Sequence, residues 1–570
     1  MKRKCTFVMA VLLCLLTSAQ TIEHVINMDK LVANKGLYLS QNNPNPFNGS
    51  TEVYLAVVDR APVTMVMTDI NGRMEAQYTS SMVSGVHRFV VSAAEKGMHV
   101  MSVHQYGRTS ACIMFCKERA ANSRIDYMEM VEAIDEELFN ELIASDKEED
   151  FIGYSLVKSA QPASSSEPFR VALSLSPFSL NQFEKGYTFI VGDQTATTPA
   201  ELQSIYKSLG STEMYMRVAT KRHRTYNADG SLDNTVDGKT DENANAHTFD
   251  QAIELAKIAA SLNIPLNPEI MCAYTYMDMD KVQAPRFEEY PSIYALQNGK
   301  KWEELSLDEI CAVLEAYGEF VADSILATGC KVVNWNLGNE ANYGFAGVGM
   351  GVKTAVDSKL ENCSAIDRYT AAIFKLWWLK KHVWKYNAKQ FAAVRRGIMK
   401  AYIKAGKDMS DVKFCTHIAT VTFTPRACAS YFQYMAKNGY MVETAGISYY
   451  PSAPAMSFNK KKLLTNTVTR INKKCNVPVF IGEFSYPSQD MVGPFAGWNS
   501  QLGSYKKNQE GQQKIYADVI AWGKTHGMAG IRYWAPDYEG EWYPMSMFEF
   551  NNKVGTAKSI LINHKNIVEQ

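Results

Sequence analysis

The chain has 570 residues, and its 59 Lys and Arg balance its 59 Asp and Glu, so the formal net charge is zero. This balance argues against a nucleic-acid-binding protein and against a protein held on an anionic membrane surface. The length exceeds one ordinary domain, although a β/α barrel takes up about 250 residues or more as one unit.

The first 19 residues have the three parts of a secretory signal peptide. Residues 2–4 are basic (KRK), residues 7–16 are apolar (FVMAVLLCLL), and residues 17–19 (TSA) offer a small-residue cleavage site. A membrane anchor needs about 20 apolar residues, and this run is shorter. We predict a cleaved signal peptide over residues 1–19, no transmembrane segment, and a protein that is secreted, periplasmic or on the cell surface.

The cysteines indicate neither a disulfide framework nor a metal site. Two of the 11 lie in the signal segment, and the other nine are scattered from Cys112 to Cys475. The close pair Cys112 and Cys116 has no His or Cys partner at zinc-finger spacing. We therefore predict no metal and no cofactor.

Residues 27–118 alternate short apolar segments with turn residues, which predicts a small antiparallel β-sandwich. The expected strands include residues 51–58, 63–69, 87–93 and 98–105. The stretch LSQNNPNPFNGSTEVYL (39–55) with MTDINGR (67–73) resembles the β-sandwich of secretion-sorting tails and of flagellar-hook-cap-type domains. Sorting tails lie at the C-terminus, whereas this segment follows the signal, so we expect an accessory domain.

Residues 119–185 differ in composition from the segments on either side. The acidic stretch 128–151 (MEMVEAIDEELFNELIASDKEEDF) predicts a solvated helix, and residues 158–168 (KSAQPASSSEP) have the composition of a flexible linker. We expect this part to connect two domains.

From residue 186 to residue 570, apolar strands alternate with helical patterns. The helices include residues 248–262 and 307–326, and an aromatic and basic helix over 371–406 follows a long insertion. Eight such units predict an α/β fold, a (β/α)₈ TIM barrel. A doubly wound sheet would need a glycine-rich phosphate loop after the first strand, and VGDQTATTP (191–199) is not one. The expected strands are 186–192, 212–220, 264–272, 331–338, 412–419, 444–450, 477–483 and 527–534.

Active sites of such barrels lie where the strands end, at the C-terminal face. Polar and aromatic residues stand at almost every expected strand end. They are Asp193, Arg217, Asn339, Glu340, His417, Tyr449, Tyr450, Glu483 and Trp534. We take these residues as the candidate site.

Glu340 and Glu483, at the ends of the fourth and seventh expected strands, suit the cleavage of a glycosidic bond. That reaction needs one carboxylic acid to protonate the leaving oxygen and a second carboxylate to act on the anomeric carbon or on water. Arg217 can keep Glu483 ionised, and Asn339 can bind the sugar hydroxyl beside the anomeric carbon. The pair thus predicts a glycosidase.

Each of these residues also has a structural explanation when taken alone. Gly-Asn-Glu after a strand is often a turn, Arg217 fits a structural ion pair, and His417 fits a hydrogen-bonded core residue. Tyr449 and Trp534 are ordinary packing residues in isolation. The conjunction of two glutamates on strands four and seven of an exported barrel favours the catalytic interpretation.

Four motifs resemble glycoside hydrolase family 53, the endo-β-1,4-galactanases. They are NWNLGNEANYG (334–344), GISYYPSAP (446–454), VPVFIGEFSYP (477–487) and GIRYWAPDYEGEW (530–542), and the likeness extends over about residues 186–565. The family pattern gives way to a different segment after the third strand, at residues 269–291.

The resemblance implies a retaining hydrolase with Glu340 as acid/base and Glu483 as nucleophile. Asn339, Arg217, His417, Tyr449 and Trp534 would hold the sugar, and the strand-end position adds Asp193 as a substrate-binding candidate. The implied partner is a plant cell-wall polysaccharide, β-1,4-galactan of pectic arabinogalactan, and we expect a monomer.

Other functions stay open at this point. Another β-glycanase of the same clan, acting on mannan, xylan or a β-glucan, would use the same two glutamates. A non-catalytic glycan-binding surface protein would keep the barrel as a sugar-holding cleft, although the presence of both glutamates argues against it. An adhesion role centred on the β-sandwich is the remaining alternative.

Overall fold

The computed structural model describes residues 30–31, 34–132, 134, 168–364, 367–368, 371, 375–409, 412–454 and 460–570. The chain divides into two compact units, residues 1–146 with 373–375, and residues 147–372 with 376–570. The predicted signal peptide and almost all of the predicted linker lie outside the described residues.

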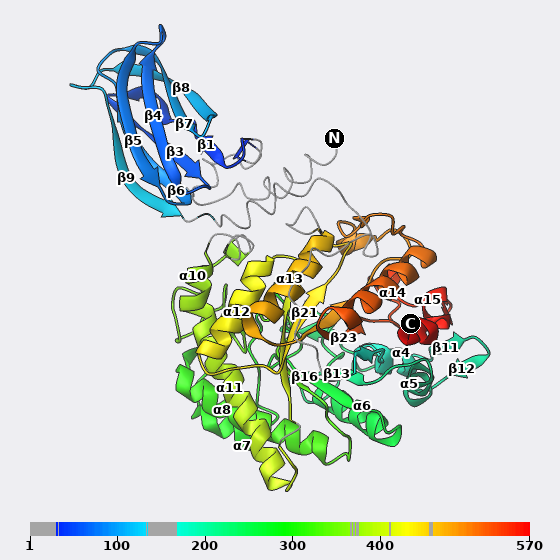
Figure 1. Cartoon of the computed structure of the whole chain (residues 1–570). Helices are drawn as coiled ribbons and strands as arrows, with labels where there is room; N and C mark the ends of the chain where they lie inside the picture. The colour runs from blue at the N-terminus through cyan, green and yellow to red at the C-terminus, as the bar shows by residue number, and fades with distance from the viewer. Residues whose placement is uncertain are drawn as a thin grey trace. The chain divides into compact units, whose positions relative to one another are not determined.

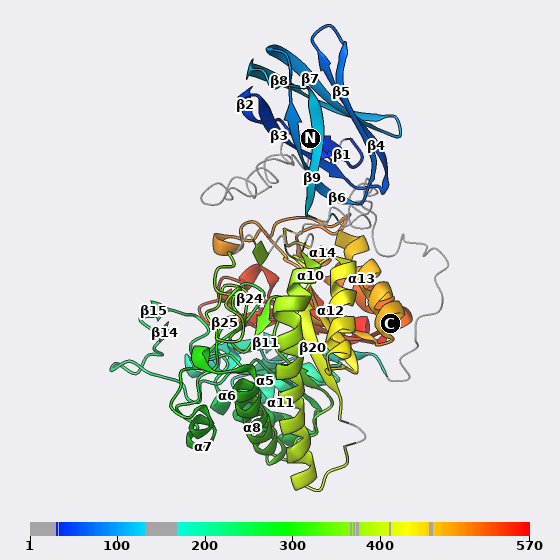
Figure 2. The same cartoon turned by 90° about the vertical axis from the view of Figure 1, so that its left-hand side faces the viewer.

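The N-terminal unit is a nine-stranded, mainly antiparallel sheet folded over on itself (Figures 1 and 2). The strand order is β5-β4-β7-β8-β2-β3-β6-β9, and β1 pairs with β3. The two ends of this path, β5 and β9, contact each other, and the ring of Phe89 packs edge-on against Tyr78 and Tyr127. The strands are β1 (Leu37–Leu39), β2 (Asn43–Asn48), β3 (Ser50–Val57), β4 (Ala61–Asp69), β5 (Met74–Met82), β6 (Gly85–Ser92), β7 (Gly97–Gln105), β8 (Arg108–Glu118) and β9 (Arg124–Glu132).

The predicted acidic helix is wrong at its start, where the structure has the strand β9. Residues 124–132 pair antiparallel with β6, so the start of the acidic stretch belongs to the sheet. The backbone groups on the open side of β6 can be satisfied by one more strand, and this outweighs the helical pattern of the stretch. The rest of the predicted helix, except Ile134, lies outside the described residues.

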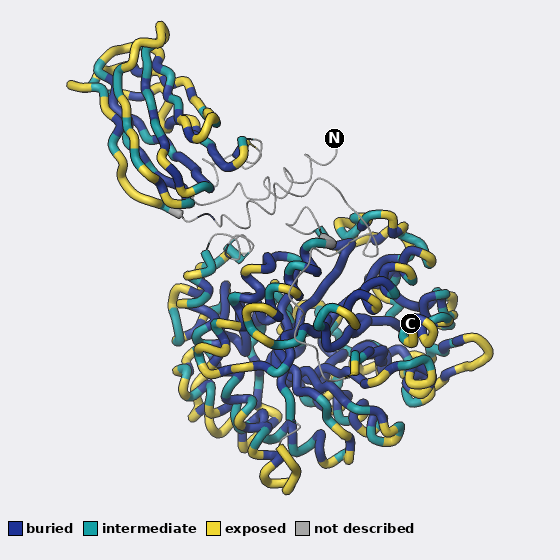
Figure 3. Tube along the Cα trace, in the orientation of Figure 1, coloured by how far each residue is buried: buried dark blue, intermediate teal, exposed yellow. Residues whose placement is uncertain are grey.

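The second unit is a parallel eight-stranded barrel surrounded by helices, which confirms the predicted fold class (Figure 1). The strand order is β10-β23-β22-β21-β20-β17-β16-β13, and every adjacent pair is parallel. The strands are β10 (Arg170–Ala172), β13 (Met214–Val218), β16 (Leu266–Ile270), β17 (Trp335–Leu337), β20 (Phe414–Ala419), β21 (Thr444–Tyr449), β22 (Val479–Phe484) and β23 (Met528–Tyr533). Figure 3 shows these strands buried at the centre of the unit.

The first barrel strand is β10, not the predicted segment 186–192. Residues 188–191 form β11 (Thr188–Val191), which belongs to a separate sheet with β12 (Gln194–Ala196), β25 (Val554–Ala557) and β24 (Phe548–Asn551). The strand β10 has only three residues, too few for a periodic pattern to reveal, so the described part of the barrel unit begins before residue 186.

Predicted helices over 248–262 and 307–326 are present as α6 (Phe249–Ser261) and α8 (Leu307–Leu326). Both begin at capping boxes, in which the side chain of Thr248 or Ser306 accepts a hydrogen bond from the backbone three residues later. These caps end the preceding loops at defined residues.

The aromatic and basic stretch after the fourth strand is one continuous helix with a π-helical turn. It contains α10 (Leu376–Leu379), a π-helical turn over 380–384, and α11 (Lys385–Lys404). Figure 2 shows α11 running alongside α8. No helix in the described part of the chain has the length and apolar character needed to cross a membrane.

The barrel has a seam between its first and second strands, where no strand ladder is formed. The backbone N–H of Tyr215 donates to Ser174 Oγ (2.8 Å), and the N–H of Leu173 donates to Ser211 Oγ (3.1 Å). The N–H of Thr212 donates to the carbonyl of Val171 (2.9 Å). Hydrogen bonds to serine hydroxyls, together with one backbone hydrogen bond, therefore connect the first and second strands and close the barrel here.

Candidate active site

Glu340 and Glu483 meet at the C-terminal mouth of the barrel. Glu340 follows the fourth strand, β17, and Glu483 lies near the end of the seventh, β22. One carboxylate oxygen of each residue and a ring nitrogen of His417 all lie within 4.8 Å of one another. Glu340 has a left-handed backbone conformation (φ 45°), which a non-glycine residue rarely adopts, and the N–H of its neighbour Ala341 donates to the carbonyl of His417 (3.1 Å).

Glu483 is surrounded by donors that stabilise its ionised form. Arg217 Nη2 donates to Glu483 Oε1, and the hydroxyl of Tyr450 donates to Oε2 (2.5 Å). Charge-assisted hydrogen bonds of this kind favour the carboxylate over the neutral acid. Glu483 therefore has the environment of a nucleophile.

Glu340 has the opposite environment. Its withdrawal from water, the charge of Glu483 and the charge of Asp278 together raise the pKa of Glu340 well above its usual range. Burial also raises the pKa of Asp278 to about 6. Two carboxyl groups whose surroundings push their charge states apart define an acid and a nucleophile.

Arg217, on β13, links the residues of the site. Its Nε donates to Glu269 Oε1 (2.5 Å), and its Nη2 donates to Asn339 Oδ1 (2.7 Å) as well as to Glu483. Its guanidinium carbon lies 4.0 Å from the centre of the Trp534 ring. Asn339 is further held by a hydrogen bond from its Nδ2 to the carbonyl of Met277 (2.6 Å).

His417, on β20, lies between two carboxylates. Its Nδ1 is 2.9 Å from Glu269 Oε2, and its Nε2 is 3.9 Å from Glu483 Oε1. The adjacent strand β21 approaches it closely, because a Cβ at Gly446 would lie 2.3 Å from His417 Cβ. Glycine at position 446 thus makes room for the imidazole.

Glu269, on β16, was not predicted. It is fully buried and accepts hydrogen bonds from Tyr215 (2.5 Å), Asn336 (3.1 Å) and Arg217. Burial alone would raise the pKa of Glu269, but Arg217 and His417 outweigh it and hold the pKa well below the usual range. The sequence did contain one indication of its role, because Glu269 is the single carboxylate within the apolar strand IPLNPEIMC (264–272).

Two predicted site residues are elsewhere. Asp193 lies in the exposed turn between β11 and β12, because the strand before it is not a barrel strand. Tyr449 is buried in the hydrophobic core near Phe484, and its neighbour Tyr450 faces Glu483 instead. Successive residues of a strand point to opposite sides. A prediction that is wrong by one position therefore selects a core residue in place of a residue of the site.

The same cluster contains the donor atoms of a metal site, but it does not suit a cation. Glu340, His417 and Glu483 supply three converging ligand atoms. Arg217, a permanent cation, donates to Glu483 Oε1. A second positive charge there would be repelled, whereas proton transfer between the carboxyl groups and a substrate is compatible with the arrangement.

A family model and several solved structures are similar to this chain. Residues 295–566 match the model of glycosyl hydrolase family 53. The Ignisphaera aggregans GH53 catalytic domain is 15% identical, with a TM-score of 0.50 over 72% of this chain and 98% of that chain. A structure from a study of two fungal β-1,4-galactanases is 15% identical, with a TM-score of 0.48 over 70% of this chain and 98% of that chain. No curated protein matches.

A β/α barrel with paired glutamates at the mouth, matched by a hydrolase family model, is a glycoside hydrolase. More specifically, the chain contains a glycosyl hydrolase family 53 domain, as the motifs predicted. The strands β10, β13 and β16, before the matched residues, complete its barrel.

Proposed function

We propose that the protein is a secreted, retaining endo-glycoside hydrolase that cleaves β-1,4-galactan of pectic arabinogalactan. The observation that carries the proposal is the pair Glu340 and Glu483, whose oxygens lie within 4.8 Å and whose environments favour opposite charge states. Export is supported by the signal-like residues 1–19.

In the first half of the reaction, a Glu483 oxygen attacks the anomeric carbon and the bond to the leaving oxygen breaks. Glu340 transfers its proton to that oxygen, so the leaving sugar departs as a neutral alcohol. The product of this step is a glycosyl ester of Glu483. Arg217 and Tyr450 hold the nucleophile in place during the attack.

In the second half, Glu340 accepts a proton from water, whose oxygen attacks the anomeric carbon and releases Glu483 as a carboxylate. The ester removes the negative charge of Glu483, one of the causes of the high Glu340 pKa. The pKa of Glu340 therefore falls once the ester has formed, so its ionised form is available to accept the proton of water in the second step.

The short separation supports retention of configuration. Retaining enzymes place their carboxyl groups about 5 to 5.5 Å apart, whereas inverting enzymes need roughly 6.5 to 9.5 Å to admit a water molecule. An oxygen-to-oxygen separation within 4.8 Å fits direct attack by Glu483.

An aromatic wall beside Glu483 supports a sugar substrate. Tyr450 packs against Trp498 (5.3 Å) and Trp542 (5.4 Å), and Phe495 packs edge-on against both tryptophans. Trp498 and Phe495 are partly exposed and can stack on sugar rings. The choice of galactan among β-glycans rests on the family 53 domain.

The test is release of reducing sugar from purified β-1,4-galactan by the native protein and by Glu483→Gln. We expect the variant to lose activity by about 1000-fold or more, because a neutral amide cannot form the glycosyl ester. Glu510→Gln, an exposed change on the barrel unit, is the matched control and should keep full activity.

Equal rates for native protein and Glu483→Gln would contradict the assigned nucleophile. Cleavage of mannan, xylan or a β-glucan in place of galactan would keep the mechanism and change the substrate. Binding without cleavage of any of these glycans would instead support a glycan-binding protein. NMR of the first-formed anomer tests retention, and N-terminal sequencing of exported protein tests the signal peptide.

A further inference from the structure

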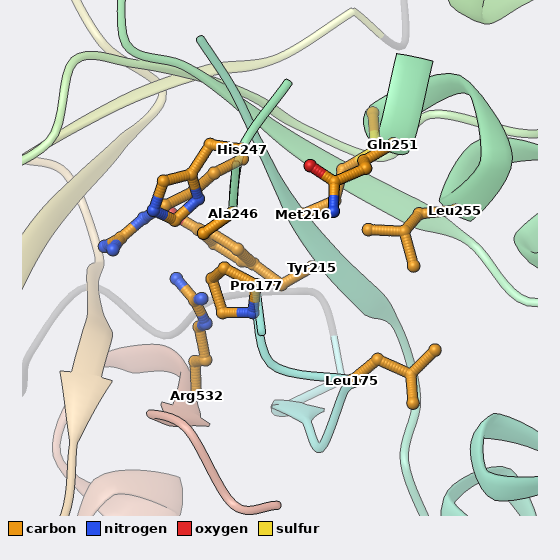
Figure 4. Close-up of a pocket in the computed structure, with 10 residues that line it drawn as sticks. Leu175, Pro177, Tyr215, Met216, Ala246, His247, Gln251, Leu255 and Arg532 are labelled. Atoms are coloured by element: carbon orange, nitrogen blue, oxygen red, sulfur yellow. The ribbon is translucent and has the colours of Figure 1, made fainter. Parts of the chain in front are cut away.

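A small cavity lies at the seam of the barrel, next to Arg217 (Figure 4). Its volume is about 10 Å³, enough to admit a water-sized particle. In Figure 4 the guanidinium end of Arg532 points toward the ring of His247, with Pro177 beside them. The cavity is lined by Leu175, Pro177, Tyr215, Met216, Arg217, Ala246, His247, Gln251, Leu255 and Arg532.

Three nitrogen atoms of the lining residues have no hydrogen-bond partner within the described part of the chain. They are Nη1 of Arg217, Nη1 of Arg532 and Nδ1 of His247. Each of these residues is only 2% exposed. No acidic residue lines the cavity, and its lining includes the two arginines, His247, the Gln251 amide and the Tyr215 side chain.

Arg532, on β23, differs from Arg217 in how its charge is compensated. Arg217 pairs with Glu269 and Glu483. Arg532 lies over the rings of Tyr215 (3.7 Å) and Trp534 (4.6 Å), and it forms no ion pair with any carboxylate of the described residues. A buried cation without an anionic partner is costly, and aromatic rings compensate only part of that cost.

We infer that this cavity binds a small monovalent inorganic anion of the size of chloride, held by Arg532 and Arg217. His247 contributes a donor when its Nδ1 carries the proton. Its Nε2 then accepts a hydrogen bond from the side-chain amide of Asn243, which lies 3.1 Å away and can be rotated so that its nitrogen faces the ring.

A bound anion would act on the glutamates through Arg217. It would offset part of the positive charge of Arg217, which by itself lowers the pKa of Glu340. The anion would therefore disfavour loss of the proton from Glu340 and raise its pKa further. The pH–rate profile should therefore move to higher pH in chloride, by roughly half a unit or more.

Binding is measured by the broadening of the ³⁵Cl NMR line in a titration of the full chain. We expect saturable broadening that Arg532→Met abolishes, because methionine fills a similar volume without charge or donors. Arg532→Lys should weaken binding, because it keeps the charge without the planar guanidinium. Arg396→Met, an exposed change on α11, is the matched control.

Broadening that is absent in native protein, or equal in native protein and Arg532→Met, would overturn the inference in favour of water or of ordinary surface ions. Competition by acetate or galacturonate as strong as that by bromide would overturn it in favour of a carboxylate site. If circular dichroism shows that Arg532→Met is unfolded, His247→Phe is used in its place. The NMR measurement needs no turnover, so its failure is separate from failure of the proposed hydrolase function.

Discussion

Arg217 distributes its donors among three partners, and this division sets the chemistry of the site. One edge of its guanidinium contacts Glu269, and Nη2 contacts both Asn339 and Glu483. Glu483 accepts a hydrogen bond from this permanent cation. Within the described part of the chain Glu340 accepts no such hydrogen bond from Arg217, and its burial together with the charges of Glu483 and Asp278 raises its pKa. The assignment of nucleophile and acid therefore rests on the donors around Glu483 and on the burial of Glu340.

The adjacent tyrosines of β21 provide a matched pair of variants. Tyr450→Phe removes the hydroxyl that donates to Glu483, and a hydrogen bond to a charged group contributes about 1.5 to 3 kcal/mol. We expect kcat/KM to fall by roughly 10- to 100-fold. Tyr449→Phe alters a core residue and should leave kcat/KM nearly unchanged. Similar losses in both variants would refute the role of Tyr450.

Asp278 provides a test through pH dependence. Its negative charge raises the pKa of Glu340, so Asp278→Asn should lower that pKa. The acid would then lose its proton at lower pH, and the basic limb of the kcat/KM profile should shift downward. Asp280→Asn, two residues away and exposed, should shift it less. An unchanged or upward-shifted limb after Asp278→Asn would contradict the assignment.

At the scale of elements, the helices α8 and α11 meet through glycine. A Cβ at Gly397 would lie 2.0 Å from the carbonyl oxygen of Glu315, and a Cβ at Gly318 would lie 2.6 Å from that of Val394. The helix inserted after the fourth strand is thus packed directly onto the preceding barrel helix. This contact holds α11, the helical part of the long connection after Glu340, against α8.

Gly397→Ala is expected to destabilise the barrel unit by about 1 to 3 kcal/mol, because the two helices must move apart. Chemical denaturation followed by tryptophan fluorescence measures the change. Gly497→Ala is the matched control, since a Cβ there meets nothing within 4 Å. Equal stability of the two variants would show that the helices are not closely packed.

At the scale of the whole molecule, every residue of the candidate site belongs to the second unit. We expect residues 168–570, expressed alone, to fold and to cleave a soluble galactan oligosaccharide with the kcat/KM of the full chain. Circular dichroism checks the fold, and reducing-sugar release checks the rate. A folded but inactive barrel would show that the N-terminal unit contributes to the reaction.

The sequence alone determined the barrel, its long helices and the pair of glutamates. Apolar strands buried on both faces and amphipathic helices are local patterns, so the helix over residues 307–326 is predicted correctly from its own periodicity. The motifs around Glu340 and Glu483 indicated the family. The three-residue strand β10 carries no such pattern, and the first barrel strand was misplaced as a result.

Only the tertiary structure decided which side chains share the site. Asp193 lies outside the site because β11 belongs to another sheet. Tyr450, and not Tyr449, contacts Glu483, because neighbouring residues of a strand face opposite sides. Glu269 lies beside Arg217, and Arg532 lies beside Trp534, because the barrel brings together strands that are far apart in sequence. Local preferences fix the elements, whereas the charge balance of a buried site depends on contacts that exist only after the barrel closes.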